Sequence, residues 1–221
     1  MRRESLLGQI TAAIKSIECT HPTRVAIDGI DAAGKTTLAD ELATALGQSN
    51  RQIIRASADD FLNTKETRYR RGPLSPQGYF NDSLDHDAIL ASVLSPLGPG
   101  GNRCYRLAGY DLSREAPVEP PPQEASPRAI LLFDGIFLTQ PALREHWDYK
   151  IFVHVSLATS TARGVQRDQD HLGGEDTARE RYARRYVPGQ QIYLDRCKPS
   201  EHADVVINNE DPEHPQVIWK D

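Results

Sequence analysis

One octapeptide near the N-terminus restricts the fold of this chain more than any other feature. Residues 29–36 read Gly-Ile-Asp-Ala-Ala-Gly-Lys-Thr, a complete G-x-x-x-x-G-K-[ST] pattern. The apolar, β-branched run Arg24–Asp28 predicts a buried strand before it, and Lys35–Leu46 predicts a helix after it. We expect Gly47 to end that helix in a left-handed conformation. This strand–loop–helix context favours a phosphate-binding loop over a glycine-containing turn that matches by accident.

Each part of the motif has a chemical reason. Its two glycines permit backbone conformations that side chains would block, so that successive N–H groups point at an anion beside the helix N-terminus. Lys35 is expected to neutralise the β- and γ-phosphates of ATP, and the Thr36 hydroxyl to ligate Mg²⁺. The predicted nucleotide contacts are Gly29, Ile30, Asp31, Ala32, Ala33, Gly34, Lys35, Thr36 and Thr37.

The rest of the chain alternates predicted strands and helices without an internal repeat. Residues 4–18 have apolar positions at helical spacing, and strands are predicted at 52–56, 103–107, 129–133, 149–155, 204–207 and 216–219. This order predicts an α/β P-loop NTPase fold, a three-layer sandwich with a mostly parallel central sheet and a helical lid. We expect one domain over 1–221, with an acceptor-binding insert at about 62–127 and a lid at about 160–190.

Carboxylates follow two of these strands. The run Ile130–Phe133 is followed by Asp134. Because ligands bind at the carboxyl ends of the strands in an open parallel sheet, Asp134 is a candidate magnesium ligand. The alternative interpretation is an aspartate that ends the strand without a functional role. Asp59 and Asp60 follow the strand at 52–56. Asp59 is the candidate general base for a hydroxyl acceptor, and Asp60 would either assist with magnesium or cap a helix.

The segment 160–190 carries the arginines that a lid needs to brace a phosphoryl group. Arg163 and Arg167 lie on one helical face, and Gly173-Gly174 is expected to form a hinge after them. Arg167 is a candidate catalytic residue and Arg163 a candidate nucleotide contact. For Arg179 and Arg181 a solvated face paired with neighbouring acids is the favoured interpretation.

Composition narrows the class further. The net charge of -5 gives no general attraction to nucleic acid or anionic membrane. Three cysteines without ligand spacing indicate a reducing, cytoplasmic setting, and the N-terminus does not resemble a signal peptide. The expected partners are ATP and a small molecule. The sequence does not indicate the oligomeric state, and it is compatible with a homo-oligomer.

Several motifs together resemble the uridine kinase family of P-loop kinases, which groups near phosphoribulokinase and pantothenate kinase. The similar elements are residues 25–42, 57–61, 133–136 and 159–168, and Pro199 together with residues 203–207. The resemblance implies that Asp59 is the catalytic base. In the acceptor region this chain lacks the family's Asp-His-Pro element and a downstream histidine. The candidate substrate contacts there are Tyr79, Asp82, Tyr105 and Arg106, although the two tyrosines could equally serve packing.

The sequence therefore predicts an ATP- and Mg²⁺-dependent kinase that phosphorylates a hydroxyl of a small metabolite. By resemblance the acceptor is a uridine- or cytidine-like nucleoside. The alternatives are a kinase for pantothenate, a sugar or a sugar phosphate, and an ATP-binding module or NTPase without an acceptor. A GTPase is disfavoured because the chain has no Asn/Thr-Lys-x-Asp guanine motif.

Overall fold

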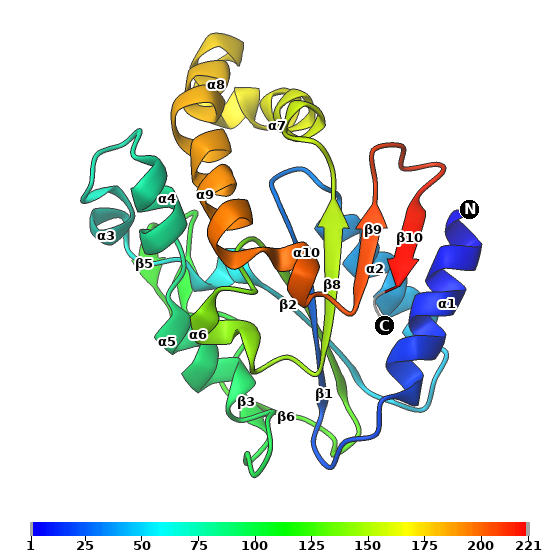
Figure 1. The fold of residues 1–221 in the computed structure, drawn as a ribbon. Helices are drawn as coiled ribbons and strands as arrows, with labels where there is room; N and C mark the ends of the chain where they lie inside the picture. The colour runs from blue at the N-terminus through cyan, green and yellow to red at the C-terminus, as the bar shows by residue number, and fades with distance from the viewer. Residues whose placement is uncertain (1, 220–221) are drawn as a thin grey trace.

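Six strands form the central sheet in the order β10-β9-β8-β1-β7-β2, in a computed structural model that describes residues 2–219 (Figure 1). The strands are β1 (Thr23–Gly29), β2 (Ile53–Ser57), β7 (Ile130–Gly135), β8 (Tyr149–His154), β9 (Val205–Asn208) and β10 (Gln216–Trp219). β1, β2, β7, β8 and β9 run parallel, and β10 pairs antiparallel with β9. The predicted mostly parallel sheet is confirmed.

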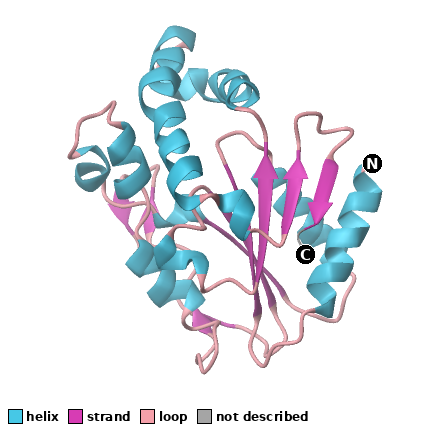
Figure 2. Cartoon of the chain, in the orientation of Figure 1, coloured by secondary structure: helices cyan, strands magenta, loops and turns pink. Residues whose placement is uncertain are grey.

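Side chains that alternate along each strand build one core on each face of the sheet. Along β1, Val25 and Ile27 join the core beneath α1 (Arg3–Ser16) and α2 (Lys35–Leu46), whereas Ala26 joins the opposite core. That second core is covered by α4 (Pro76–Asp82), α5 (His86–Ile89), the π-helical turn η2 (Leu90–Leu94) and α9 (Val187–Cys197). Figure 2 shows the resulting helix–sheet–helix layers.

The predicted lid segment is helical and turns at two glycines. α7 (Leu157–Leu172) and α8 (Glu175–Arg181) meet at Gly173 and Gly174, whose φ values of 90° and 113° favour glycine. The π-helical turn η3 (Tyr182–Tyr186) then leads into α9. In Figure 1 this helical unit stands beside the upper end of β8, near the loop that follows β1.

The chain between β2 and β7 contains short elements outside the main sheet. They are the 3₁₀ turn η1 (Ala58–Phe61), α3 (Lys65–Tyr69) and the two-residue strands β3 (Cys104–Tyr105), β4 (Tyr110–Asp111), β5 (Ala116–Pro117) and β6 (Gln123–Glu124). Two short helices, α6 (Pro141–Arg144) and α10 (Pro199–His202), complete the fold. No described helix combines the length and apolar composition that spanning a membrane requires.

Three local expectations need correction. Gly47 has φ -60° and ψ -16°, so α2 ends in right-handed rather than left-handed backbone. The strand expected at 103–107 is only Cys104–Tyr105, which pairs with β6 instead of the main sheet. The sequence also predicts a lid helix over residues 177–186, but the helical backbone continues directly into α9, because Pro188 lies in the first turn of a helix, where its missing N–H costs nothing.

Candidate active site

The loop between β1 and α2 is shaped by close backbone approaches at its two motif glycines. A Cβ on Gly29 would lie 2.5 Å from the carbonyl oxygen of Val153 in β8. Gly34 has φ +94°, and a Cβ there would lie 2.7 Å from Asn209 Nδ2, which itself donates to the carbonyl of Ala33. The sequence motif therefore matches a loop geometry that other residues would disturb, and the loop lies at the carboxyl end of β1, before the N-terminus of α2.

Lys35 and Thr36 open α2 beside the strand-end carboxylate. The buried Lys35 Nζ donates to the carbonyl of Ile30 across the loop at 2.8 Å. Thr36 Oγ1 donates to Asp134 Oδ2 at 2.7 Å, and the other oxygen of Asp134 accepts from Arg55 at 3.0 Å. A hydroxyl and a carboxylate oxygen in direct contact are the hard donors that Mg²⁺ prefers, so this pair fits the ion.

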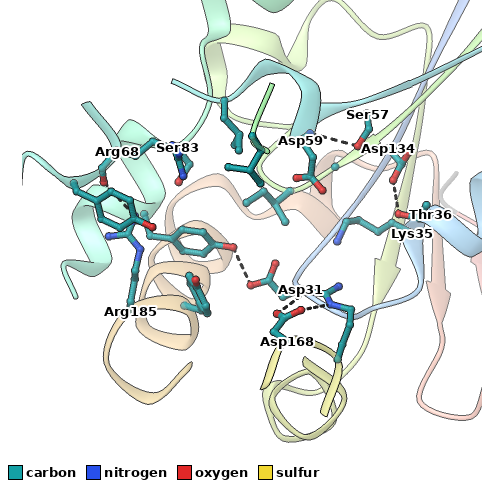
Figure 3. Close-up of a pocket in the computed structure, with 18 residues that line it drawn as sticks. Asp31, Lys35, Thr36, Ser57, Asp59, Arg68, Ser83, Asp134, Asp168 and Arg185 are labelled. Atoms are coloured by element: carbon teal, nitrogen blue, oxygen red, sulfur yellow. Dashed lines mark hydrogen bonds and ion pairs between the residues drawn. The ribbon is translucent and has the colours of Figure 1, made fainter. Parts of the chain in front are cut away.

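Asp59, in η1, is exposed to the cavity, and it lies near Lys35 on the side away from Thr36 (Figure 3). The hydrogen bond described for this residue joins its backbone N–H to Ser57 Oγ, so Ser57 rather than either aspartate caps the turn. Loss of water among the surrounding walls raises the pKa of Asp59, while the charge of Lys35 lowers it. Burial lowers the pKa of Lys35, and neighbouring carboxylates, Asp31 first, oppose that shift.

Asp31 connects the phosphate loop to three other elements. Its Oδ2 accepts from Tyr79 Oη of α4 and from Gln190 Nε2 of α9, both at 2.8 Å. Its carbonyl accepts from Ser160 Oγ of α7 at 2.7 Å. Burial raises the pKa of Asp31, and Lys35 is the largest opposing influence. The loop is therefore held by α4 of the insert, by α7 of the lid and by α9.

Two adjoining cavities meet at Lys35, Thr36 and Arg167, which line both of them. The first, of about 380 Å³, lies over the phosphate loop and is completed by Ala32, Gly34, Thr37 and Arg163. The second, of about 270 Å³, extends from Asp59 and Asp134 towards the insert. It is lined further by Asp31, Ser57, Leu62, Arg68, Tyr69, Tyr79, Ser83, Leu112, Gly135, Ile136, Asp168, Arg185 and Tyr186.

Two arginines of α7, Arg163 and Arg167, line the first cavity. Arg163 donates to the backbone carbonyls of Asn209 and Glu210, and it faces the first cavity. Arg167 is paired with Asp168, whose carboxylate also accepts from Tyr182 Oη at 2.8 Å. By contrast, Arg179 forms an ion pair with Glu175 on the exposed face of α8, as predicted.

The predicted substrate contacts are only partly brought together. Tyr79 lines the second cavity, but the structure does not bring Asp82, Tyr105 or Arg106 to it. Asp82 is buried in ion pairs with Arg70 and Arg71. The buried Tyr105 donates to Gln123 Oε1, and Arg106 donates to the carbonyl of Pro120. These three positions thus have structural partners within the insert.

Sequence reasoning gave no individual role to several residues that contact or line the site, among them Arg55, Arg68, Ser160, Arg185 and Gln190. Only Arg55 carries a local signal, because it is a charged residue in the middle of the short strand β2. The other four reach the site through contacts between distant segments. Asp60, considered for magnesium, is exposed and does not line either cavity.

The parallel sheet, the glycine-shaped phosphate loop and the helical lid define a P-loop NTPase fold, and the second cavity beside the loop is the arrangement of a P-loop kinase. The chain belongs to the phosphoribulokinase / uridine kinase family, whose model matches residues 25–212. This family assignment makes the chain a kinase, a phosphotransferase with an alcohol acceptor, and confirms the resemblance found in the sequence.

Individual relatives are distant. The chain is 28% identical over 198 residues to the uridine kinase of Proteus mirabilis, covering 84% of this chain and 86% of that protein. It is also 28% identical over 190 residues to uridine-cytidine kinase B of Dictyostelium discoideum, covering 85% and 74%. A Bacillus stearothermophilus structure described as a possible uridine kinase superposes with a TM-score of 0.72 at 19% identity, over 92% and 97% of the chains, and supports the fold.

Proposed function

We propose that the protein transfers the γ-phosphoryl group of ATP to a hydroxyl of a small metabolite that binds in the second cavity. The observation that carries this proposal is the shared wall: Lys35, Thr36 and Arg167 line both cavities. A phosphoryl group that leaves a nucleotide in the first cavity towards an acceptor in the second must pass these residues. A plain ATP-binding module has no need of the second cavity.

Each residue then has a defined task. Asp59 accepts the proton of the acceptor hydroxyl and holds its oxygen in line with the γ-phosphate. Lys35 and Arg167 stabilise the negative charge on the transferring group, and Arg163 contacts the nucleotide from the lid. The phosphate loop, residues 29–37, binds the triphosphate through backbone N–H groups.

Thr36 and Asp134 would hold Mg²⁺, and the hydrogen bond from Arg55 orients the Asp134 carboxylate. When bound, the ion neutralises charge on the β- and γ-phosphates. The lid limits access of water, which would otherwise compete with the acceptor hydroxyl.

Two acceptor classes remain candidates. The names of the Proteus and Dictyostelium relatives favour a pyrimidine nucleoside. The second candidate is another metabolite alcohol, such as pantothenate, a sugar or a sugar phosphate. It is favoured by Arg185, a buried arginine in the wall of the acceptor cavity. We also propose that the protein is cytoplasmic and that it binds small molecules rather than nucleic acid or membranes.

The test is ADP formation from ATP and Mg²⁺ with uridine, cytidine, pantothenate, D-ribose and ribose 5-phosphate as separate acceptors. At least one acceptor should raise ADP formation well above the acceptor-free rate. Lys35→Ala should abolish that increase, whereas Lys15→Ala, which removes an exposed lysine of α1, should not. ATP hydrolysis that is equally fast with and without every acceptor would instead indicate an NTPase.

A further inference from the structure

The acceptor cavity has two chemically different ends. Asp59 and Asp134 lie with Lys35 at the phosphate loop, whereas Arg68 and Arg185 lie at the opposite side of the close-up in Figure 3. Arg68 comes from α3 in the insert, and Arg185 comes from the π-helical turn η3 of the lid. An acceptor whose hydroxyl meets Asp59 would therefore extend its other end towards these two arginines.

Arg185 is a buried cation without an acidic partner. Its side chain is 2% exposed, and it donates to the backbone carbonyls of Arg68, Pro73 and Ser75. None of the ion pairs found within residues 2–219 includes it. Its guanidinium carbon lies 4.7 Å from the ring centroid of Tyr69. Carbonyl dipoles and an aromatic face stabilise the charge but do not neutralise it.

The neighbouring arginines show that this arrangement is specific. Arg184, one position earlier, points to solvent and pairs with Glu180. Arg68 is also buried, but Glu115 forms an ion pair with it at 2.5 Å. Arg185 therefore leaves the far end of the cavity with an uncompensated positive charge. Burial lowers the pKa of Arg185, as expected for a cation that lacks a counter-ion.

We propose that the acceptor carries an anionic group, a carboxylate or a phosphate, which binds at Arg185 while its hydroxyl faces Asp59. This inference rests on the proposed function and narrows its acceptor to charged metabolites. A planar guanidinium matches either anion with paired hydrogen bonds, and a neutral nucleoside has no group that compensates it. The aromatic walls formed by Tyr69 and Tyr186 exclude water and strengthen the interaction.

The first test compares acceptors with the wild-type protein at saturating ATP and Mg²⁺. Ribose 5-phosphate supplies a phosphate, D-glycerate and pantothenate supply a carboxylate, and D-ribose and uridine are neutral. At least one anionic acceptor should have a kcat/KM tenfold or more above both neutral compounds. Which anionic compounds respond distinguishes phosphate from carboxylate. If uridine or D-ribose equals or exceeds all anionic compounds, the inference is overturned while the kinase assignment stands.

The second test uses variants of Arg185. Arg185→Gln retains a donor for the backbone carbonyls but removes the charge, so the KM for the anionic acceptor should rise at least tenfold, with the KM for ATP within twofold. Arg185→Lys should recover part of the loss, and the exposed control Arg184→Gln should behave as wild type. An unchanged acceptor KM in Arg185→Gln, or an equal rise for neutral acceptors, would contradict an anion site.

Binding provides an independent readout if none of these acceptors turns over. The protein is saturated with a non-hydrolysable ATP analogue and Mg²⁺, so that the phosphate loop is filled, and is titrated calorimetrically with ribose 5-phosphate, D-glycerate and pantothenate. Saturable binding of one of them to wild type but not to Arg185→Gln supports the inference. Absence of binding by all three refutes it, and failure to bind the nucleotide analogue refutes the proposed function itself.

Discussion

Asp59→Asn tests the proposed chemistry most directly, because it removes the charge and keeps the shape of the side chain. A positioned general base contributes about 10²–10⁴ in rate, so kcat should fall by that factor, which corresponds to about 3–5 kcal/mol in the activation barrier. The affinity for ATP should change little, since the phosphate loop and Lys35 are intact. The assay is ADP formation with the best acceptor, together with a nucleotide titration.

The structure also predicts that this variant folds normally. The hydrogen bond described for Asp59 uses its backbone N–H, so Asn loses no carboxylate partner. The pKa of Asp59 is raised in the folded state, so the folded protein holds this proton more tightly than the unfolded chain does. Stability from this group therefore falls as pH rises from the usual aspartate range through the raised value. At pH 7 Asp59→Asn should melt at the same temperature as wild type or higher.

The pH dependence and a neighbouring control complete this test. Because the base must be ionised, wild-type kcat/KM should fall at acidic pH. The midpoint of this fall should lie at a pH above about 3.9, the ordinary pKa of an aspartate, because the pKa of Asp59 is raised. Asp60→Asn removes an exposed carboxylate that does not line either cavity, and it should retain kcat within about threefold of wild type. Wild-type turnover by Asp59→Asn, or equal losses in both variants, would refute the assignment of the base.

Three further predictions concern the loop and its support. Gly34→Ala should abolish nucleotide binding in a titration and lower the melting temperature, since it forces a Cβ onto positive φ and against Asn209; normal ATP affinity would contradict this. Arg55→Ala leaves the buried Asp134 without its ion pair and should destabilise the fold by about 3 kcal/mol in denaturant titrations, whereas a change below about 1 kcal/mol would show that the pair is dispensable. Thr11→Val removes a buried hydroxyl without a hydrogen-bond partner and should stabilise the protein by about 1 kcal/mol; destabilisation would show that the hydroxyl has a partner.

Local sequence patterns were enough to predict the elements that depend on local physics. The runs predicted as strands at 24–28, 129–133 and 149–155 became β1, β7 and β8, and the strand predicted at 216–219 is β10. Lys35, Thr36 and Asp59 line the cavities because the parallel strands β1 and β2 deliver their carboxyl ends to one edge of the sheet. Arg163 and Arg167 line the cavities from α7. These are consequences of periodicity and of strand direction, both of which can be read from the sequence.

The contacts that complete the site could not be predicted in this way. Gln190 meets Asp31 across 159 positions, and neither residue carries a local pattern that indicates its partner. The outward Arg184 and the inward Arg185 are adjacent residues of the same type, and the π-helical turn that contains both has no compositional signature. In the insert, Tyr105 is buried in the hydrophobic core. From the sequence alone, a tyrosine that packs in the core looks the same as a tyrosine that contacts substrate.

The attachment of Asp31 to α4, α7 and α9 has a consequence for how the two substrates influence each other. A nucleotide that repositions Asp31 should also shift Tyr79 and Gln190, which bind its carboxylate, and Ser160, which binds its backbone carbonyl. Thermodynamic linkage then requires reciprocity: whatever factor ATP adds to acceptor affinity, the acceptor adds to ATP affinity. We therefore expect the affinities for ATP and for the acceptor to depend on each other through Asp31.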